Sequence, residues 1–120
     1  MHNSRGQGRK WEEFAEDFLK RRGLKPIGRN YQQRFGEIDL LLLDQQTLVF
    51  AEVRYRANQS HGTGADSVTS AKQRRIIAAA RHFLQSNGEH RFRPCRFDVI
   101  SIGTDRGRPT IDWIKGAFSS

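Results

Sequence analysis

Two carboxylates interrupt neighbouring apolar segments in the stretch FGEIDLLLLDQQTLVFAEVRYR, which covers residues 35–56. They are Asp39 and Glu52, and each lies where an alternating pattern predicts a buried strand. A buried carboxylate is costly unless a cation or hydrogen-bond donors accompany it. The sequence offers Arg54 or Arg34 as a cation for a structural salt-bridge cluster, and a divalent metal ion is the other possibility.

The two acids can meet if the segments form a hairpin with a turn at Gln45-Gln46. Side chains alternate between the faces of a strand, so an even-length turn places Asp39 opposite Glu52 and Glu37 opposite Arg54. Two opposed carboxylates repel each other, and the pKa of one rises unless a cation lies between them. A turn of odd length would put them on opposite faces of the sheet. We expect the even-length turn.

A metal ion at this position would have a defined chemistry. Two carboxylates, completed by water and a substrate phosphate, provide the hard oxygen ligands that suit Mg²⁺ or Mn²⁺. Such an ion can lower the pKa of a bound water and neutralise charge on a phosphorane-like transition state. The salt bridge and the metal ion are both compatible with the hairpin.

Two helices are expected to position further polar residues. Apolar residues recur at helical spacing from Trp11, and Gly23 is a plausible end of this helix. Glu12 lies at the border of its apolar stripe and could reach across packed neighbours. A second helix is expected from the N-cap Thr69 to about residue 87, with Gln73 on its inward face.

The remaining periodicity predicts five strands and an α/β fold, a mixed sheet flanked by helices in the order α-β-β-β-α-β-β. The expected strands are residues 25–31, 37–43, 48–56, 95–102 and 110–114. Residues 1–8 are expected to be a loose arm, residues 9–120 a single domain, and residues 57–66 a flexible loop.

The charge balance indicates a nucleic-acid partner. The 120 residues carry 21 lysines and arginines against 13 acids, a formal charge of +8, and 16 of the 21 are arginine. Arginine presents a planar fork that fits phosphate oxygens, and no basic amphipathic helix with a large apolar face suggests a membrane surface instead. The candidate phosphate contacts are Arg22, Arg34, Arg56, Lys72 and Arg75.

Cysteine use and hydropathy exclude other classes. Cys95 is the only cysteine, so it forms no internal disulfide and no zinc cluster, which fits a reducing cytoplasm. No apolar run near the start resembles a signal peptide, and the longest apolar run is too short to span a bilayer.

Several motifs resemble a known family. GEID at residues 36–39, followed by VFAEVR at residues 49–54, resembles the D-x(n)-E-x-K core of the PD-(D/E)XK nuclease superfamily. The order and spacing of further motifs resemble the YraN-type family, a small bacterial family likened to Holliday-junction resolvases. These motifs are WEEFAEDFL at residues 11–19, RNY at 29–31, R-x-G at 34–36, VTSAKQRRI at 68–76 and RFDV at 96–99.

This resemblance implies a restriction-endonuclease-like fold and a metal-dependent endonuclease that acts on structured or branched DNA. It implies Asp39 and Glu52 as ligands of a weakly bound Mg²⁺ or Mn²⁺, and Glu12 as a helix-borne acid that holds a water or a second ion. Gln73 matches a helix glutamine of the family, and Arg54 takes the position of the motif lysine. A resolvase would also be a symmetric homodimer, since it needs two active sites.

Arg54 is the departure from the motif. Arginine can stabilise charge but cannot serve as a base, and its fork could occupy the metal's place. We expect it to point outward toward a phosphate. Two alternatives stay open: a nucleic-acid-binding module that has the nuclease fold without its chemistry, and a protein-interaction scaffold with a basic surface.

Overall fold

The computed structural model describes residues 4–56 and 68–120, with side chains from residue 8 onward. Its elements are α1 (Ser4–Arg21), β1 (Lys25–Gln33), β2 (Gly36–Asp44), β3 (Thr47–Tyr55), α2 (Ser70–Ser86), the short 3₁₀ helix η2 (Gly88–His90), β4 (Cys95–Asp105) and β5 (Arg108–Phe118). The α/β class and the expected order of helices and strands are confirmed. The loop expected at residues 57–66 lies outside the described residues.

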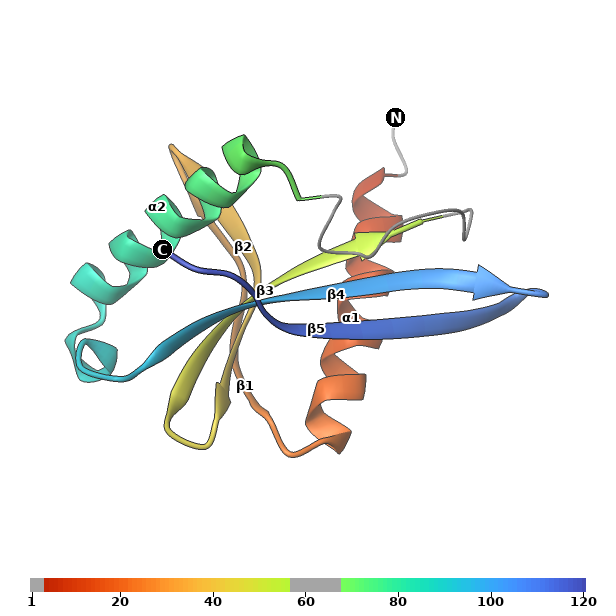
Figure 1. The fold of residues 1–120 in the computed structure, drawn as a ribbon, viewed down its shortest axis with the longest axis horizontal. Helices are drawn as coiled ribbons and strands as arrows, with labels where there is room; N and C mark the ends of the chain where they lie inside the picture. Colours follow the sequence, from red (N-terminus) through yellow and green to blue (C-terminus); the bar gives the residue numbers. More distant parts are fainter. Residues whose placement is uncertain (1–3, 57–67) are drawn as a thin grey trace.

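The five strands form one mixed sheet in the order β1-β2-β3-β4-β5 (Figure 1). All neighbours are antiparallel except β3 and β4, which are parallel. A parallel pair needs a crossover connection, and α2 lies within that connection. The helices cover opposite faces of the sheet, with α1 on one side and α2 on the other (Figure 1).

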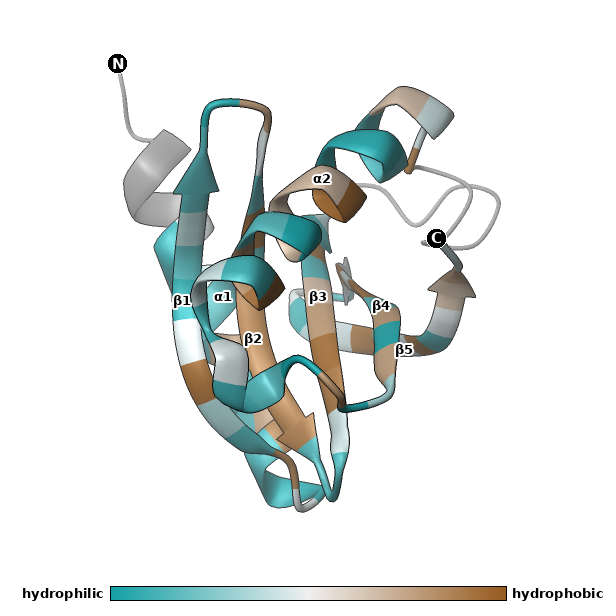
Figure 2. Ribbon diagram, turned by 90° about the vertical axis from the view of Figure 1, so that its left-hand side faces the viewer, coloured by the Kyte–Doolittle hydropathy of each residue, from teal (hydrophilic) through white to brown (hydrophobic). Residues whose placement is uncertain are grey.

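Each helix closes its own hydrophobic core. Ile76, Ala79 and Ala80 of α2 pack with Phe50 of β3 on one face. The cluster on the α1 face contains Ala15, Leu19, Leu40, Leu42, Val49, Ala51, Ile100 and Ile102. Because both faces of β2 and β3 are buried, these central strands are apolar along most of their length, whereas β1 at the edge is largely polar (Figure 2).

The start of α1 corrects an expectation. The helix begins at Ser4, so residues 4–8 continue the helix and do not form the expected loose arm; residues 1–3 lie outside the described residues. Propagation of a helix that is already nucleated adds one hydrogen bond per residue, and this opposes the unfavourable helix propensity of Gly6 and Gly8. The expected end at Gly23 is confirmed. Gly23 has a φ of 93°, and Leu24 N donates to Leu19 O at 3.1 Å, which closes the helix in a Schellman-type motif.

The last two strands are longer than the sequence predicts, and η2 was not expected. Arg106 and Gly107 both have positive φ, 54° and 78°, and this geometry suits a two-residue hairpin turn. The pairing therefore runs up to Asp105 opposite Arg108, at the end of a long projecting hairpin (Figure 1). Neither described helix has the length and apolar composition to cross a bilayer.

Candidate functional site

The β2–β3 hairpin has the register that the sequence predicts. Asp44 pairs with Thr47 across a two-residue turn, and the ladder continues as far as Leu40 opposite Ala51. Beyond that pair β2 and β3 diverge (Figure 1). The next residues along the two strands are Asp39 and Glu52. Both carboxylates therefore lie where the ladder between two central strands ends.

Asp39 continues the ladder with its side chain. Its Oδ2 accepts a hydrogen bond from Val53 N at 2.8 Å, which takes the place of a backbone partner. The pKa of Asp39 is raised to about 8, mainly by burial and then by repulsion from Glu52, and the Val53 hydrogen bond opposes this only in part. Asp39 therefore keeps its proton at neutral pH when no further cation is present.

Two cations accompany the buried carboxylate of Glu52. Its side chain is only 4% exposed, and Oε2 lies 3.3 Å from Lys72 Nζ and 3.9 Å from Arg54 Nη1. Lys72 reaches it from the first turn of α2, whereas Arg54 is on the same strand. The other oxygen, Oε1, is buried and has no hydrogen-bond partner among the described residues. A buried carboxylate oxygen without a partner is costly, and it leaves one acceptor available to a ligand.

Glu12 approaches this pair from the other helix. The Trp11 ring stacks on Tyr55 with centroids 4.4 Å apart, which fixes α1 against the end of β3 and places the next residue near Glu52. Burial raises the pKa of Glu12, a hydrogen bond with Asn30 lowers it, and repulsion from Glu37 and Glu52 raises it. Glu12 is thus an acid at the edge of the site, as the helical spacing predicts.

The donor set fits a cation that also binds water or phosphate. Within residues 4–56 and 68–120, no group of three or more His, Cys, Asp or Glu side chains is arranged to hold a metal ion. Asp39 and Glu52 could supply two ligands, and the unpartnered Oε1 of Glu52 is the atom that such an ion would satisfy. Any further ligands would come from water or a bound phosphate.

Three other expected site residues, Gln73, Arg22 and Arg56, make contacts elsewhere in the fold. Gln73 donates from Nε2 to Val68 O at 3.0 Å, so its amide ties down the start of α2. Arg22 lies just beyond α1, roughly 15 Å along the helix axis from Glu12, with its guanidinium over the Phe18 ring. Arg56 follows β3 directly, and its backbone N donates to Ile102 O.

Three expected phosphate contacts do converge. Arg34, Lys72 and Arg75 line one pocket between the β1–β2 turn and α2. The role of Lys72 as partner of Glu52 was missed from the sequence. The available signal was its spacing: Lys72 precedes the buried Ile76 by four residues, so the two share a helix face.

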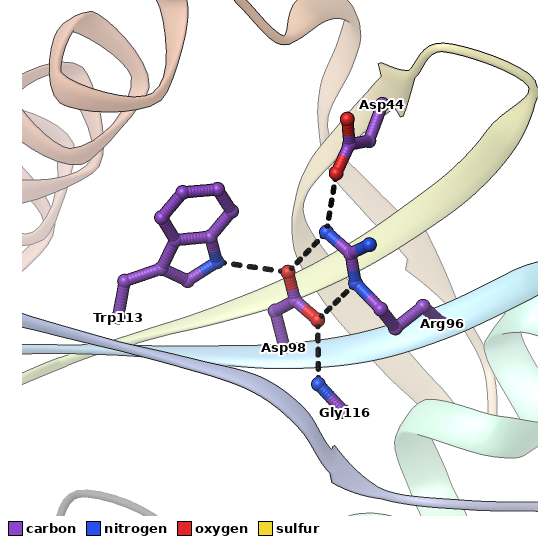
Figure 3. A network of polar contacts seen from close by, with 5 residues as sticks. All are labelled: Asp44, Arg96, Asp98, Trp113 and Gly116. Atoms are coloured by element: carbon purple, nitrogen blue, oxygen red, sulfur yellow. Dashed lines mark hydrogen bonds and ion pairs between the residues drawn. The ribbon is translucent and has the colours of Figure 1, made fainter. Parts of the chain in front are cut away.

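A second buried carboxylate, Asp98 on β4, was also missed (Figure 3). Its Oδ1 accepts from Arg96 Nε at 2.9 Å and Gly116 N at 3.0 Å, and its Oδ2 accepts from Arg96 Nη2 at 3.1 Å and Trp113 Nε1 at 2.9 Å. Arg96 Nη2 also reaches Asp44 Oδ2 at 3.0 Å. With both oxygens satisfied, Asp98 ties β5 to β4 and offers nothing to a ligand.

Comparison with known proteins identifies the family. A UPF0102 protein of Nitrosococcus oceani is 47% identical over 114 residues, which cover 95% of this chain and 92% of the relative. A UPF0102 protein of Alcanivorax borkumensis is 47% identical over 121 residues, covering 100% and 97%. The model of the Uncharacterised protein family UPF0102 matches residues 11–102. The chain therefore belongs to this family, which is the YraN-type family that its motifs resemble.

Proposed function

We propose that this protein is a metal-dependent nuclease that hydrolyses phosphodiester bonds in structured or branched DNA. The observation that carries the proposal is the half-buried carboxyl group of Asp39 beside the buried one of Glu52, whose Oε1 lacks any hydrogen-bond partner among the described residues. The motifs shared with the PD-(D/E)XK core and the charge of +8 support the same proposal.

Each residue has a role in this proposal. Asp39 and Glu52 would hold Mg²⁺ or Mn²⁺, which when bound supplies an acidified water and charge neutralisation at the phosphate. Lys72 places an ammonium beside Glu52 and balances its charge. Arg54 is one-third exposed and only at the outer limit of an ion pair with Glu52, so its guanidinium is free to meet a phosphate oxygen.

Glu12 would orient a water, or help hold a second ion, from the α1 side of the pair. Gln73 would act through the placement of α2, since its amide is bonded to Val68 O. A nuclease that resolves four-way junctions would be a homodimer, because two strands must be cut by two symmetric sites. DNA in the cytoplasm would be its substrate.

A second candidate function has an observation of its own. Lys72 and Arg54 already supply two positive charges to Glu52, and the proton on the pair further reduces the need for a metal ion. A nucleic-acid-binding module with the nuclease fold but no metal ion would have the same arrangement of charges around Glu52. Both candidates require DNA affinity that falls with salt, with a log–log slope of roughly −0.9 per phosphate contacted, whereas a protein-interaction scaffold requires none.

A Mn²⁺ titration of the wild type and of Asp39→Asn, followed by calorimetry, separates these functions. The wild type is expected to bind one ion per site, more tightly at pH 8 than at pH 6, because binding must displace the proton on Asp39. Asp39→Asn should show no such heat. Asp17→Asn is the control, since it removes the same charge from an exposed position on α1. Identical titrations for all three proteins would exclude the metal site and leave the binding module.

A matched pair of variants tests the two cations. The Lys72 and Arg54 side chains are equally exposed, 34% each, and each substitution by methionine removes one positive charge. Because Lys72 lies closer to Glu52 Oε2, we expect Lys72→Met to reduce Mn²⁺-dependent cleavage of a labelled four-way junction by about 10²-fold or more, and Arg54→Met to reduce it less. An equal loss in both variants would contradict the assignment of Lys72.

A further inference from the structure

A pocket of about 300 Å³ adjoins the carboxylate pair, between the β1–β2 turn and the first turns of α2. Its volume is at the lower end of those that hold small ligands. The lining residues are Gln32, Gln33, Arg34, Phe35, Gly36, Glu37, Lys72, Arg75 and Ile76. Lys72 belongs both to this pocket and to the carboxylate pair, because its Nζ lies 3.3 Å from Glu52 Oε2. A ligand in the pocket would therefore lie next to the proposed metal site.

The fold holds this pocket in a fixed shape. The turn carrying Arg34 and Phe35 is pressed onto α2 at Gly36, where an added Cβ would lie 2.3 Å from Arg75 O. This close approach of two backbones lets Arg34 and Arg75 line the same pocket, although they come from different elements. The pocket is thus built by packing between the hairpin and the helix, and both parts are within the described residues.

The exposure of Phe35 is not explained by packing of the fold. Its side chain is 67% exposed at the pocket, so it contributes little to either hydrophobic core. An exposed aromatic ring beside basic side chains is the combination with which proteins bind unpaired bases, since the ring stacks on the base and the cations meet the phosphates. The pocket has three cations, Arg34, Lys72 and Arg75, against one acid, Glu37.

The remaining lining groups suit the edge of a base. Gln32 and Gln33 carry amide donors and acceptors, and Gln32 Nε2 donates to Glu37 Oε2 at the long distance of 3.4 Å. Such groups can exchange a weak mutual contact for hydrogen bonds to a base. A base within a continuous duplex is stacked and paired, and its extraction costs several kcal/mol. A base that is already unpaired enters without that cost.

We propose that this pocket binds an unpaired nucleotide that adjoins the phosphate at Asp39 and Glu52, with the base stacked on Phe35 and the flanking phosphates on Arg34 and Arg75. The inference rests on the proposed function and narrows its substrate class. The DNA that this protein recognises has unpaired nucleotides beside the reacting phosphate, as in branched junctions, flaps and single-stranded ends, and a continuous duplex is bound more weakly.

The test is a binding measurement in EDTA, where no metal-dependent cleavage occurs. The probes are two fluorescein-labelled DNA hairpins of equal length, one blunt and one with a single-stranded overhang, at fixed salt. The wild type should prefer the overhang. Phe35→Ala should weaken overhang binding by about 5- to 150-fold, the range for loss of one base–aromatic stack, and leave blunt binding unchanged. Phe35→Trp should keep the preference.

Phe92→Ala is the matched control, because Phe92 is 87% exposed, carries Arg91 over its ring and does not line the pocket. It should bind both probes like the wild type. Equal affinity of the wild type for both probes, or equal effects of Phe35→Ala on both, would overturn the inference. Asp39→Asn separates this inference from the proposed function, because the variant should still prefer the overhang probe. If the overhang preference is present but neither the wild type nor any variant cleaves DNA, the nuclease proposal is refuted and the nucleotide pocket is retained.

Discussion

Replacing Asp39 by asparagine should make the fold more stable, and increasingly so as the pH rises. The amide oxygen can still accept the hydrogen bond from Val53 N, now 2.8 Å long, so the end of the ladder is retained. What the substitution removes is an ionisable group whose pKa is about 8 in the folded protein, against an ordinary value of 3.8. The folded chain therefore binds a proton that the unfolded chain has lost over most of that interval.

The sign and size follow from proton linkage. Where the folded state holds one more proton than the unfolded state, the free energy of unfolding falls by about 1.4 kcal/mol for each unit rise in pH. For wild type this contribution is present at low pH and is lost as the pH rises from about 4 toward 8, where the folded state also releases its proton. Between pH 5 and pH 7 the difference between Asp39→Asn and wild type should grow by up to about 3 kcal/mol.

The charged groups around Asp39 determine how large this change in the free energy of unfolding with pH will be. Repulsion from Glu52 and Glu12 acts in the same direction as burial, whereas Lys72 and Arg54, both near Glu52 Oε2, offset part of the charge of Glu52. Because repulsion from Glu52 is the second cause of the raised pKa of Asp39, Glu52→Gln should reduce the pH dependence of stability that Asp39 gives to wild type.

The assay is urea unfolding at pH 5, 6, 7 and 8 in EDTA for wild type, Asp39→Asn and Asp17→Asn. The gap between Asp39→Asn and wild type should widen with pH, and the gap for the exposed Asp17 should stay constant. Excess Mn²⁺ at pH 8 should then stabilise wild type and Asp17→Asn, but not Asp39→Asn, by about 2.7 kcal/mol at one hundred times the dissociation constant. Parallel pH curves for wild type and Asp39→Asn would refute the reasoning.

Two further substitutions test the supports of the site. Gly36→Ala should destabilise the protein by about 1–3 kcal/mol in urea unfolding, since the added Cβ would lie 2.3 Å from Arg75 O. Gly88→Ala is the control: nothing lies within 4 Å of its Cβ, so it should change stability by about 0.5 kcal/mol or less. Similar values for both variants would contradict the close packing at Gly36. Trp113→Phe should cost about 1–3 kcal/mol in thermal unfolding because it removes one of the donors to buried Asp98, and an unchanged melting temperature would count against that network.

The parts of the fold that could be predicted from sequence depend on local physics. The β2–β3 register follows from an even-length turn at Gln45-Gln46 and the alternation of side chains, and it places Asp39 beside Glu52. The start of α2 follows from Thr69, whose Oγ1 accepts from Lys72 N at 3.1 Å. The end of α1 follows from the conformational freedom of Gly23, which has a φ of 93°.

The parts that were missed depend on contacts between distant segments. Lys72 meets Glu52 because α2 crosses from β3 to the parallel β4, and the position of that helix over the sheet is set by tertiary packing. The pocket depends on Gly36 touching Arg75, a contact between a hairpin turn and a helix that no local pattern encodes. The length of β5 depends on its pairing with β4, since six of its eleven residues are exposed and none is fully buried.

The sheet carries two carboxylate clusters with different surroundings, and the contrast between them supports the proposal that one of them binds a cation. Asp98 is enclosed by four hydrogen bonds that reach both of its oxygens, from a guanidinium, an indole and a backbone N–H. Asp39 receives one backbone hydrogen bond, while both cations near Glu52 lie against Oε2 and leave Oε1 without a partner among the described residues. The cost of burying a carboxylate does not depend on its purpose, so the partnerless oxygen of Glu52 destabilises the folded chain unless a proton or a cation meets it. In the proposed function that cation is the metal ion, and the pair Asp39 and Glu52, unlike Asp98, is therefore where we expect it to bind.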